Sequence, residues 1–375
     1  MRIRDICAGI SDGSHNPPQS VEVSDCLMLS SKNVFDDEIT FDDPRYLLPV
    51  DFEQEDKRTK IKPGDVLLTI VGTVGRTAVV SETMPSFTVQ RSVAVLHPKV
   101  EICNSRYLMY ALQGKRGYIE NHAKGVAQKG IYLKEVANIN LRVPSLKEQI
   151  SIVECLDKVT ALIRVRKQEI QKFDELIKAR FVELFSGVED EDKLINLCTF
   201  IDYRGKTPEK AESGLPFITA KNVKMHHMSF ETQEFISKET YDKVMTRGFP
   251  RIGDVVFTTE APLGNVCRIP FIETEFYIGQ RIITMQTKLL EPAYLEYALS
   301  SDYFKRKIVA KSSGSTVTGI RSKLLEQLTI PVPPRALQKQ FAAFIVQIDK
   351  SKIAVQKSLD KTQQLFDSLM QKYFG

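Results

Sequence analysis

The sequence of 375 residues lacks the features that mark secreted, membrane-spanning or metal-stapled proteins. It has no run of about 18 apolar residues, so we expect no membrane-spanning helix. The first residues, MRIRDICAGISDGSH, contain no apolar stretch of the kind found in a signal peptide. Its six cysteines are scattered without a CxxC pair, which favours reduced thiols over disulfides or a zinc site. These absences predict a cytoplasmic protein.

The chain also lacks tryptophan, which excludes no class of function, and it lacks a strong excess of charge. The formal net charge is +5 and the isoelectric point is near 8.7. This value permits nucleic acid as a partner but does not indicate one unaided, since an isoelectric point above about 9 is the usual sign. The length and a hydrophobic content of 42% predict two domains, each with its own core.

No catalytic constellation stands out. Asn16-Pro17-Pro18 is similar to part of an amino-methyltransferase motif, but Gln19 occupies the position that needs an aromatic ring. Gly205-Lys206-Thr207 is similar to the end of a phosphate loop, but Phe200 stands where the first glycine is required. His226 and His227 are adjacent, so on a strand they would face opposite ways and make a poor metal pair. The sequence therefore predicts a protein that is not an enzyme and holds no metal.

The chain does contain an internal repeat. IKPGDVLLT at 61–69 matches PRIGDVVFT at 250–258, and aligning Asp65 with Asp254 gives an offset of 254 − 65 = 189. LSSKNV at 29–34 matches ITAKNV at 218–223 at the same offset, and Gly75 falls on Gly264. So many collinear matches indicate a duplicated unit.

Each copy has the same expected order of elements. A turn-rich opening leads to β segments at 66–72 and 255–259, entered by Gly-Asp turns, and to further strands at 88–96 and 277–285. A short helix, a basic loop rich in Gly and Ser (123–130 and 310–319), and a Pro-punctuated strand follow. We therefore predict an α/β (α+β) fold with two repeated mixed α/β domains related by a pseudo-two-fold axis.

Each copy ends in a long amphipathic stretch without Pro or Gly, near 150–185 and 341–374. Apolar residues recur at heptad spacing, which predicts two long coiled-coil helices that pair antiparallel and separate the domains. At 1.5 Å per residue each would span roughly 50 Å. The alternative is that each helix packs only on its own domain. The predicted pairing residues are Ile163, Ile170, Phe173, Ile177, Leu184, Ile348, Val355, Leu359, Phe366 and Leu369.

These patterns divide the chain into four segments. The predicted boundaries are 1–145 for the first domain, 146–187 for the central spacer helix, 188–334 for the second domain and 335–375 for the C-terminal spacer helix.

Polar and basic residues recur in the loops of both copies. Arg, Lys, Asn and Gln form paired hydrogen bonds to base edges, and Ser, Thr and Lys bind phosphates. The alternative for each is solvated surface, and for Gln90-Arg91 and Gln280-Arg281, expected in mid-strand, it is an internal polar contact. The candidate DNA-binding residues are Lys32, Asn33, Arg76, Arg91, Lys124, Gln128, Lys129, Arg204, Lys206, Lys221, Asn222, Asn265, Arg281, Lys311, Ser313, Ser315 and Thr316.

Two segments resemble a known family. SSGSTVTGIRSKLLEQLTIPVPPRALQKQFAAFI at 312–345 and KGVAQKGIYLKEVANINLRVPSLKEQISIV at 124–153 resemble the junction between target-recognition domain and conserved helix in the specificity (S) subunit of type I restriction–modification enzymes. The strand motifs KPGDVLLT and IGDVVFT are similar to that family as well, and the resemblance covers essentially the whole chain.

This resemblance implies a non-catalytic subunit for double-stranded DNA, with each domain reading one half of a bipartite, asymmetric site. It implies that the helices set the half-site spacing and dock two methyltransferase (M) subunits, with motor-nuclease (R) subunits joining for cleavage. S-adenosylmethionine and ATP would then bind only to partner subunits. Outward residues Arg164, Lys167, Glu169 and Lys172 become candidates for partner contacts, with solvated charge as the alternative. The competing hypotheses are a coiled-coil scaffold that binds proteins and never DNA, and an enzyme with unrecognised motifs.

Overall fold

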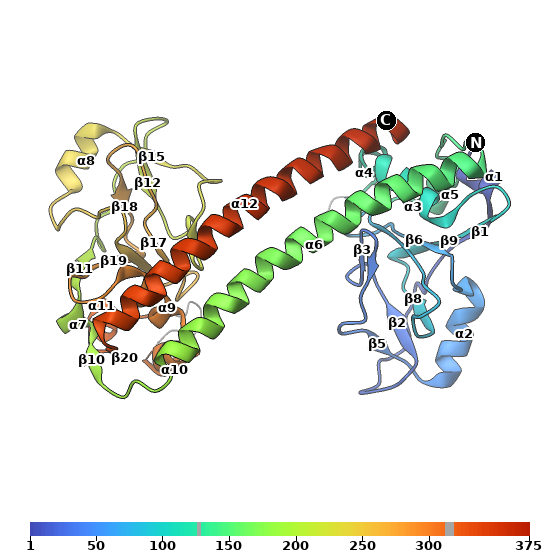
Figure 1. The fold of residues 1–375 in the computed structure, drawn as a ribbon. Coiled ribbons are helices and arrows are strands. Elements are labelled where there is room, and N and C mark those ends of the chain that lie inside the picture. Colours follow the sequence, from blue (N-terminus) through green and yellow to red (C-terminus); the bar gives the residue numbers. More distant parts are fainter. Residues whose placement is uncertain (126–128, 312–318) are drawn as a thin grey trace. The chain divides into compact units, whose positions relative to one another are not determined.

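The computed structural model describes residues 1–125, 129–311 and 319–375, and the chain packs as two units. Unit 1 is Met1–Gln168 with Gln356–Gly375, and unit 2 is Glu169–Val355. Two 40-residue helices, α6 (Leu146–Phe185) and α12 (Arg335–Phe374), each contribute to both units (Figure 1). The predicted mixed fold with two long helices is confirmed.

In unit 1 a four-stranded antiparallel sheet forms the centre, in the order β1-β9-β6-β7. A second sheet, β5-β2-β8, and the hairpin β3-β4 extend it. The apolar strands bury one face of the first sheet against helix α3 and the other against the second sheet. The strands are β1 (Cys7–Asp12), β2 (Leu27–Leu29), β3 (Val34–Phe35), β4 (Glu38–Ile39), β5 (Arg45–Tyr46), β6 (Val66–Thr69), β7 (Thr77–Val79), β8 (Phe87–Val89) and β9 (Val93–Pro98). The helices are α1 (Ile3–Ile6), α2 (Pro49–Thr59), α3 (Ser105–Gly114), α4 (Arg116–His122) and α5 (Leu133–Ala137).

Unit 2 repeats this arrangement, with sheets β11-β19-β16-β17 and β15-β12-β18 and the hairpin β13-β14, to which a β10-β20 pair is added. Its strands are β10 (Glu191–Lys193), β11 (Thr199–Asp202), β12 (Leu215–Ile218), β13 (Val223–Lys224), β14 (His227–Met228), β15 (Phe235–Ile236), β16 (Val255–Thr258), β17 (Val266–Arg268), β18 (Tyr277–Ile278), β19 (Ile282–Gln286) and β20 (Thr329–Pro331). Its helices are α7 (Leu194–Leu197), α8 (Lys238–Val244), α9 (Pro292–Ser300), α10 (Asp302–Lys311) and α11 (Ser322–Glu326).

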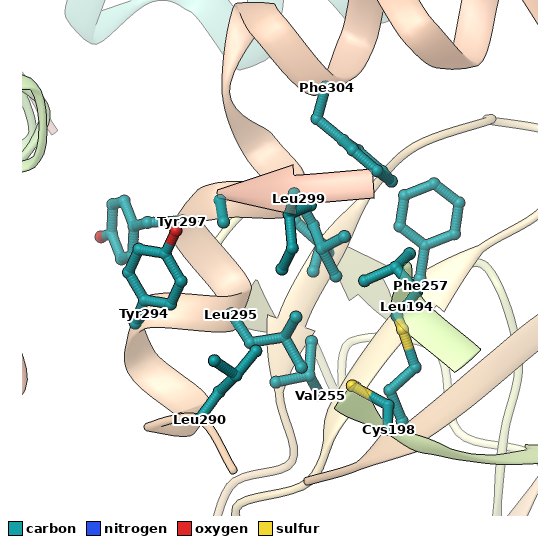
Figure 2. Close-up of a cluster of buried hydrophobic side chains, with 14 of the residues drawn as sticks. Leu194, Cys198, Val255, Phe257, Leu290, Tyr294, Leu295, Tyr297, Leu299 and Phe304 are labelled. Carbon is teal, nitrogen blue, oxygen red and sulfur yellow. The ribbon is translucent and has the colours of Figure 1, made fainter. Parts of the chain in front are cut away.

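Helix α9 has two buried sides. Figure 2 shows Leu295 and Leu299 directed toward Val255 and its neighbours, while the rings of Tyr294 and Tyr297 lie on another side of the helix. Those two tyrosines join a cluster of aromatic rings that includes Phe181 of α6 and Phe341 of α12, at centroid distances of 5.4–6.4 Å. Packing of the α9 aromatics therefore attaches the long helices to the sheet of unit 2.

The predicted pairing residues lie on the packed side of the long helices. Ile177 is fully buried and Ile348 nearly so, and Phe173 and Leu184 pack against the same core in unit 2. In unit 1, Phe366 and Leu369 pack against a core that contains Ile152 and Leu156 of α6. The remaining predicted residues are buried or half-buried: Ile163, Ile170, Val355 and Leu359. Within each unit the helices also pack on the domain, so pairing and packing on the domain occur together.

Each long helix is anchored at its start by a buried glutamine. The side chain of Gln149 accepts a hydrogen bond from the N–H of Asn104 (2.9 Å) and donates to the carbonyls of Ile102 (2.9 Å) and Pro144 (2.8 Å). Gln338 is its equivalent, since 338 − 149 = 189, and it binds the N–H of Glu291 (2.9 Å) and the carbonyl of Pro333 (2.8 Å). A single amide thus joins the helix start to the loop before α3 or α9.

The structure corrects one strand assignment. The stretch 88–96 was expected to be one strand, but it divides into β8 and β9, with a turn in which the N–H of Val93 donates to the carbonyl of Gln90 (3.0 Å). The stretch 277–285 likewise divides into β18 and β19, with a Gly279–Ile282 turn. Arg91 and Arg281 are therefore exposed turn residues, and the mid-strand placement was wrong.

Candidate nucleic-acid interface

The strand order brings several loops to one edge of each four-stranded sheet. Because β9 runs antiparallel to both β1 and β6, the end of β1, the start of β9 and the end of β6 lie together: Asp12 pairs with Ala94, and Thr69 with Val93. Bridges from Val71 to Gly130 and from Gly130 to Lys124 add a further loop. We call this set of loops, residues 12–15, 70–76, 90–92 and 124–130, the loop edge of unit 1.

Unit 2 has an equivalent loop edge, residues 202–206, 259–265, 279–281 and 319–320. Asp202 pairs with Ile283 and Thr258 with Ile282, and Glu260 forms a bridge to Gly319. The two sheets therefore present the same loops in the same order. Twelve of the predicted DNA-binding residues lie in or beside these edges and within the described ranges. The other four to which this does not apply are Gln128, Ser313, Ser315 and Thr316, which lie outside the described residues.

A threonine at the end of β6 or β16 closes one loop of each edge. The hydroxyl of Thr69 donates to the carbonyl of Thr73 and accepts from the N–H of Arg76 (2.9 Å). In unit 2, Thr258 donates to the carbonyl of Pro262 (2.6 Å) and accepts from the N–H of Asn265 (2.9 Å). These bonds give both loops the same shape, while the side chains that the loops present differ.

Three of the predicted asparagines serve the loops internally. Asn33 is 1% exposed, accepts from the N–H of Ser30 (3.0 Å) and donates to the carbonyl of Asp42 (2.9 Å). Asn222 does the same with Thr219 (2.9 Å) and Ser229 (3.0 Å). The amide of Asn265 donates to the carbonyl of Val223 (2.9 Å). These side chains are committed to the fold, so we do not retain them in the interface.

The cations of unit 1 differ in how firmly they are held. Lys32 pairs with Asp43 (2.5 Å) on the surface, and Lys124 lies 3.8 Å from Glu135. Arg76 stacks on the ring of Phe35, with the guanidinium carbon 4.9 Å from the centroid. Arg91 is exposed on its turn.

A hollow of about 380 Å³ opens beside the loop that Thr69 closes. Arg76 and Lys129 line it together with Arg116, whose guanidinium donates to the carbonyl of Gly75 (3.1–3.2 Å) and pairs with Asp36 (2.5 Å). The hollow is basic and polar, which suits an anionic group such as a phosphate.

In unit 2 the predicted cations lie mostly in acidic company. Arg204 forms a fork to its neighbour Asp202, with distances of 2.6–3.1 Å. Arg281 pairs with Glu260 (3.2 Å), and Lys221 lies 3.8 Å from Glu234. Lys206 is half-buried and Lys311 is exposed at the end of α10.

Two aspartates at the strand ends carry displaced pKa values. Burial raises the pKa of Asp12, but hydrogen bonds from Arg58 and His15 lower it by more, so the pKa lies below its usual value. Burial of Asp202 is likewise outweighed by its hydrogen bonds with Arg204, and its pKa is lowered. Both carboxylates are therefore ionised at neutral pH and hold cations in place.

Sequence reasoning missed Arg58, His15 and Arg247, which surround these aspartates. Arg58 and Arg247 stand 247 − 58 = 189 residues apart, so the repeat itself could have revealed them. They went unnoticed because the stretches around them share little else: helix α2 and helix α8 begin 189 residues apart at Pro49 and Lys238 but have different sequences.

Sequence reasoning also missed a polar network that joins the hairpin β3-β4 to helix α6. Arg106 of α3 binds Asp37 of the hairpin (2.8 Å) and Asp157 of α6 (2.6 Å), and Arg164 reaches Asp37 at 3.3 Å. Arg164, a predicted partner contact, is therefore engaged within unit 1. Lys167 and Lys172 are exposed, and Glu169 is half-buried and has contacts within the protein.

Unit 2 makes the same connection with other residues. Glu296 of α9 is 2% exposed in its side chain and binds His226 of the hairpin (2.9 Å) and Arg268 (2.5 Å). Arg268 lies 3.9 Å from Asp349 of α12. Asp37 and His226 occupy equivalent hairpin positions, 226 − 37 = 189, and both have a left-handed backbone, with φ of 59° and 63°.

Two searches of the described residues gave negative results. None of the helices described is both long and apolar enough to cross a membrane. Within residues 1–125, 129–311 and 319–375, no three His, Cys, Asp or Glu side chains are grouped to hold a metal ion.

Comparison with known proteins agrees with the duplicated architecture. The model of the type I restriction modification DNA specificity domain matches the chain twice, at residues 46–173 and 193–365. The MjaVIII specificity subunit of a type I restriction enzyme from Methanocaldococcus jannaschii is 24% identical over 351 residues, covering 82% of this chain and 79% of the relative. The EcoBI specificity subunit from Escherichia coli is 32% identical over 107 residues, covering 28% and 22%.

Solved structures share the fold. A type I S subunit from M. genitalium aligns with a TM-score of 0.57 at 14% identity, covering 100% of this chain and 95% of that one. A chain from a structure describing complex assembly and conformational transition of the type I restriction–modification system aligns with a TM-score of 0.58 at 17% identity, covering 100% and 96%. The chain belongs to the family of type I restriction–modification DNA specificity subunits.

Proposed function

We propose that this chain reads a bipartite, asymmetric DNA site, with one half-site for each unit, and that it carries no catalytic step itself. The observation that carries this proposal is the pair of equivalent loop edges with different exposed side chains. Arg76 stands in unit 1 where Asn265 stands in unit 2, and Arg58 and Arg247 share a position but not their neighbours. Equal frames with unequal side chains favour two different half-sites.

Helices α6 and α12 are proposed to dock two copies of a methyltransferase subunit, with motor-nuclease subunits joining for cleavage. Leu176 and Leu365 support this, since they are 47% and 50% exposed and 365 − 176 = 189 residues apart. Lys172 and Lys361 precede them by one helical turn and are also exposed, so each pair forms the same small patch. One patch repeated on both helices suits two copies of one partner. S-adenosylmethionine and ATP are then expected on those partners, in the cytoplasm.

The DNA-binding proposal is tested with the chain assembled with its methyltransferase subunits. Binding to duplex DNA that contains the methylated motif is measured by fluorescence anisotropy over a range of salt concentrations. We expect the logarithm of the affinity to fall linearly with the logarithm of salt, with a slope of about −0.9 for each phosphate contacted. Absence of duplex binding at low salt would favour the alternative, a coiled-coil scaffold that binds only proteins.

The docking proposal has its own test. Leu176→Asp and Leu365→Asp each place a charge in one patch, and native mass spectrometry of the reconstituted complex counts the methyltransferase subunits. We expect each single variant to lose one copy and the double variant to lose both. Ile353→Asp is the matched control, because Ile353 is 56% exposed on α12 while its counterpart at 353 − 189 = 164 is an arginine. Retention of two copies by the double variant would exclude these patches.

A further inference from the structure

Each unit holds one arginine against the end of the first strand of its sheet. In unit 1, Arg58 donates from Nε to the carbonyl of Asp12 (2.9 Å) and from Nη2 to its carboxylate (2.5 Å). In unit 2, Arg247 donates from Nη1 to the carbonyls of Asp202 (2.9 Å) and Arg204 (2.8 Å). The same backbone carbonyl, at the end of β1 or β11, thus receives an arginine in both copies.

The equivalence of these positions does not depend on the sequence alignment alone. Asp12 pairs with Ala94 and Asp202 pairs with Ile283, and 283 − 94 = 189. The two arginines are also 189 residues apart. The surrounding stretches have diverged, so the arginine and its carbonyl partner are what the two copies share there.

The backbone beneath each arginine is held rigidly. In unit 1, a Cβ on Gly13 would lie 1.8 Å from the carbonyl oxygen of Val89, so only glycine allows this close approach. Ser14 continues it with an N–H bond to the same carbonyl (2.9 Å). In unit 2, the hydroxyl of buried Tyr203 donates to the carbonyl of Gly248 (2.6 Å) and accepts the N–H of Arg247 (3.2 Å).

Both arginines remain open to solvent although they are fixed. The side chain of Arg58 is 49% exposed, and Arg247 is also exposed. An arginine with only a structural task would be buried with its partners, whereas a purely solvating arginine would make no such set of bonds. A guanidinium that is oriented from behind and exposed in front is arranged to meet an external acceptor pair with little loss of conformational freedom.

We infer that Arg58 and Arg247 are base-reading residues, one in each half-site, and that each recognises a guanine in the major groove. This inference rests on the proposed DNA-binding function. The planar fork of arginine matches the O6 and N7 acceptors of guanine, which is the commonest specific contact in protein–DNA complexes. Both arginines lie at the loop edge that gathers the other predicted cations, so phosphate and base contacts would come from the same surface.

The neighbours of these arginines differ between the units. Asp12 also binds His15, through Nε2 at 2.8 Å, whereas Asp202 binds Arg204. His15 is 52% exposed and Arg204 is 35% exposed in its side chain. A similar first contact with a different second side chain gives half-sites that share a guanine and differ at the adjacent base pair.

The test uses the chain assembled with its methyltransferase subunits and maps the methylated motif by sequencing of a methylated DNA library. We expect Arg58→Ala to relax one guanine position in one half-site and to leave the other half-site intact. Arg247→Ala should do the same in the other half-site. Affinity for the original site should fall on the order of ten- to a hundredfold.

Two further variants separate base reading from charge and from folding. Arg58→Lys keeps the charge but loses the fork, so it should relax the same position as Arg58→Ala. Lys57→Ala changes the exposed neighbour on the same helix and should leave the motif unchanged. A uniform loss of affinity for all sequences, with a salt slope shallower by about 1, would identify a phosphate contact and overturn the inference.

Other outcomes are equally decisive. Loss of both half-sites with a lower melting temperature in Arg58→Ala would assign a structural role and overturn the inference. An unchanged motif in both alanine variants, with the unaltered complex reading a bipartite site, would refute base reading while leaving the proposed function intact. Failure of the unaltered complex to bind any duplex would refute the proposed function itself.

Discussion

Asp12 joins two cationic side chains at the residue scale, and its ionisation should make this contact depend on pH. Its pKa in the folded protein is lowered because the hydrogen bonds from Arg58 and His15 outweigh the effect of burial. A lowered pKa means that the carboxylate stabilises the fold above its unfolded pKa of about 3.9, and that this stabilisation is lost as the pH falls through the folded value.

We therefore predict that the coupling between Asp12→Asn and Arg58→Ala is greatest at pH 5 and declines toward pH 2.5. At pH 5 we expect a coupling free energy of about 1 kcal/mol, since half of the Arg58 side chain is screened by solvent. Urea denaturation of the four chains of the double-mutant cycle measures it. A coupling that grows as the pH is lowered would contradict the assigned ionisation.

Gln149 makes three hydrogen bonds to buried backbone groups, and its loss should be felt locally. Gln149→Leu keeps a similar volume but leaves those groups without partners, which should cost about 2–4 kcal/mol. We expect a lower melting temperature and faster hydrogen exchange in α3, whose preceding loop the glutamine binds. Gln171→Leu on the exposed side of the same helix is the control, with an expected change within about 0.5 kcal/mol.

At the scale of elements, helix α6 places buried and exposed apolar residues side by side. Ile177 is fully buried in the core of unit 2, whereas its neighbour Leu176 is 47% exposed. We predict that Ile177→Ala lowers the free energy of unfolding by about 2–4 kcal/mol because it leaves a cavity. Leu176→Ala should change it by less than about 0.5 kcal/mol. Equal losses in denaturation experiments would contradict the packing described.

The long helices could be predicted from the sequence because their heptad spacing is a local signal that tertiary packing reinforces. The turn at Arg91 could not, because the apolar pattern runs on from β8 into β9 and only the pairing of each strand with a different sheet creates the break. The internal roles of Asn33 and Asn222 were also hidden, since burial of a loop amide depends on contacts that composition does not report. The shared position of Arg58 and Arg247 became visible only once the strand registers were known.

At the scale of the whole molecule, α6 begins in unit 1 and ends in unit 2, while α12 begins in unit 2 and ends in unit 1. Neither domain is therefore connected to the other by an irregular linker of the chain alone. If the helices set the spacing between half-sites, as proposed, their length is a separate variable from the loop edges, and the two can be changed independently.

The test inserts seven helical residues into both helices where the units divide, after Gln168 and after Val355. One heptad in each helix keeps the apolar positions in phase and adds about 10 Å of rise. Because one base-pair step spans about 3.4 Å, we expect the spacer to lengthen by up to three base pairs while both half-site sequences stay the same. Insertion into α6 alone shifts the paired positions against each other and should abolish specific methylation. Motif mapping that found altered half-sites at the old spacing would show that the helices do not set the spacing and that the loop edges do not read independently of it.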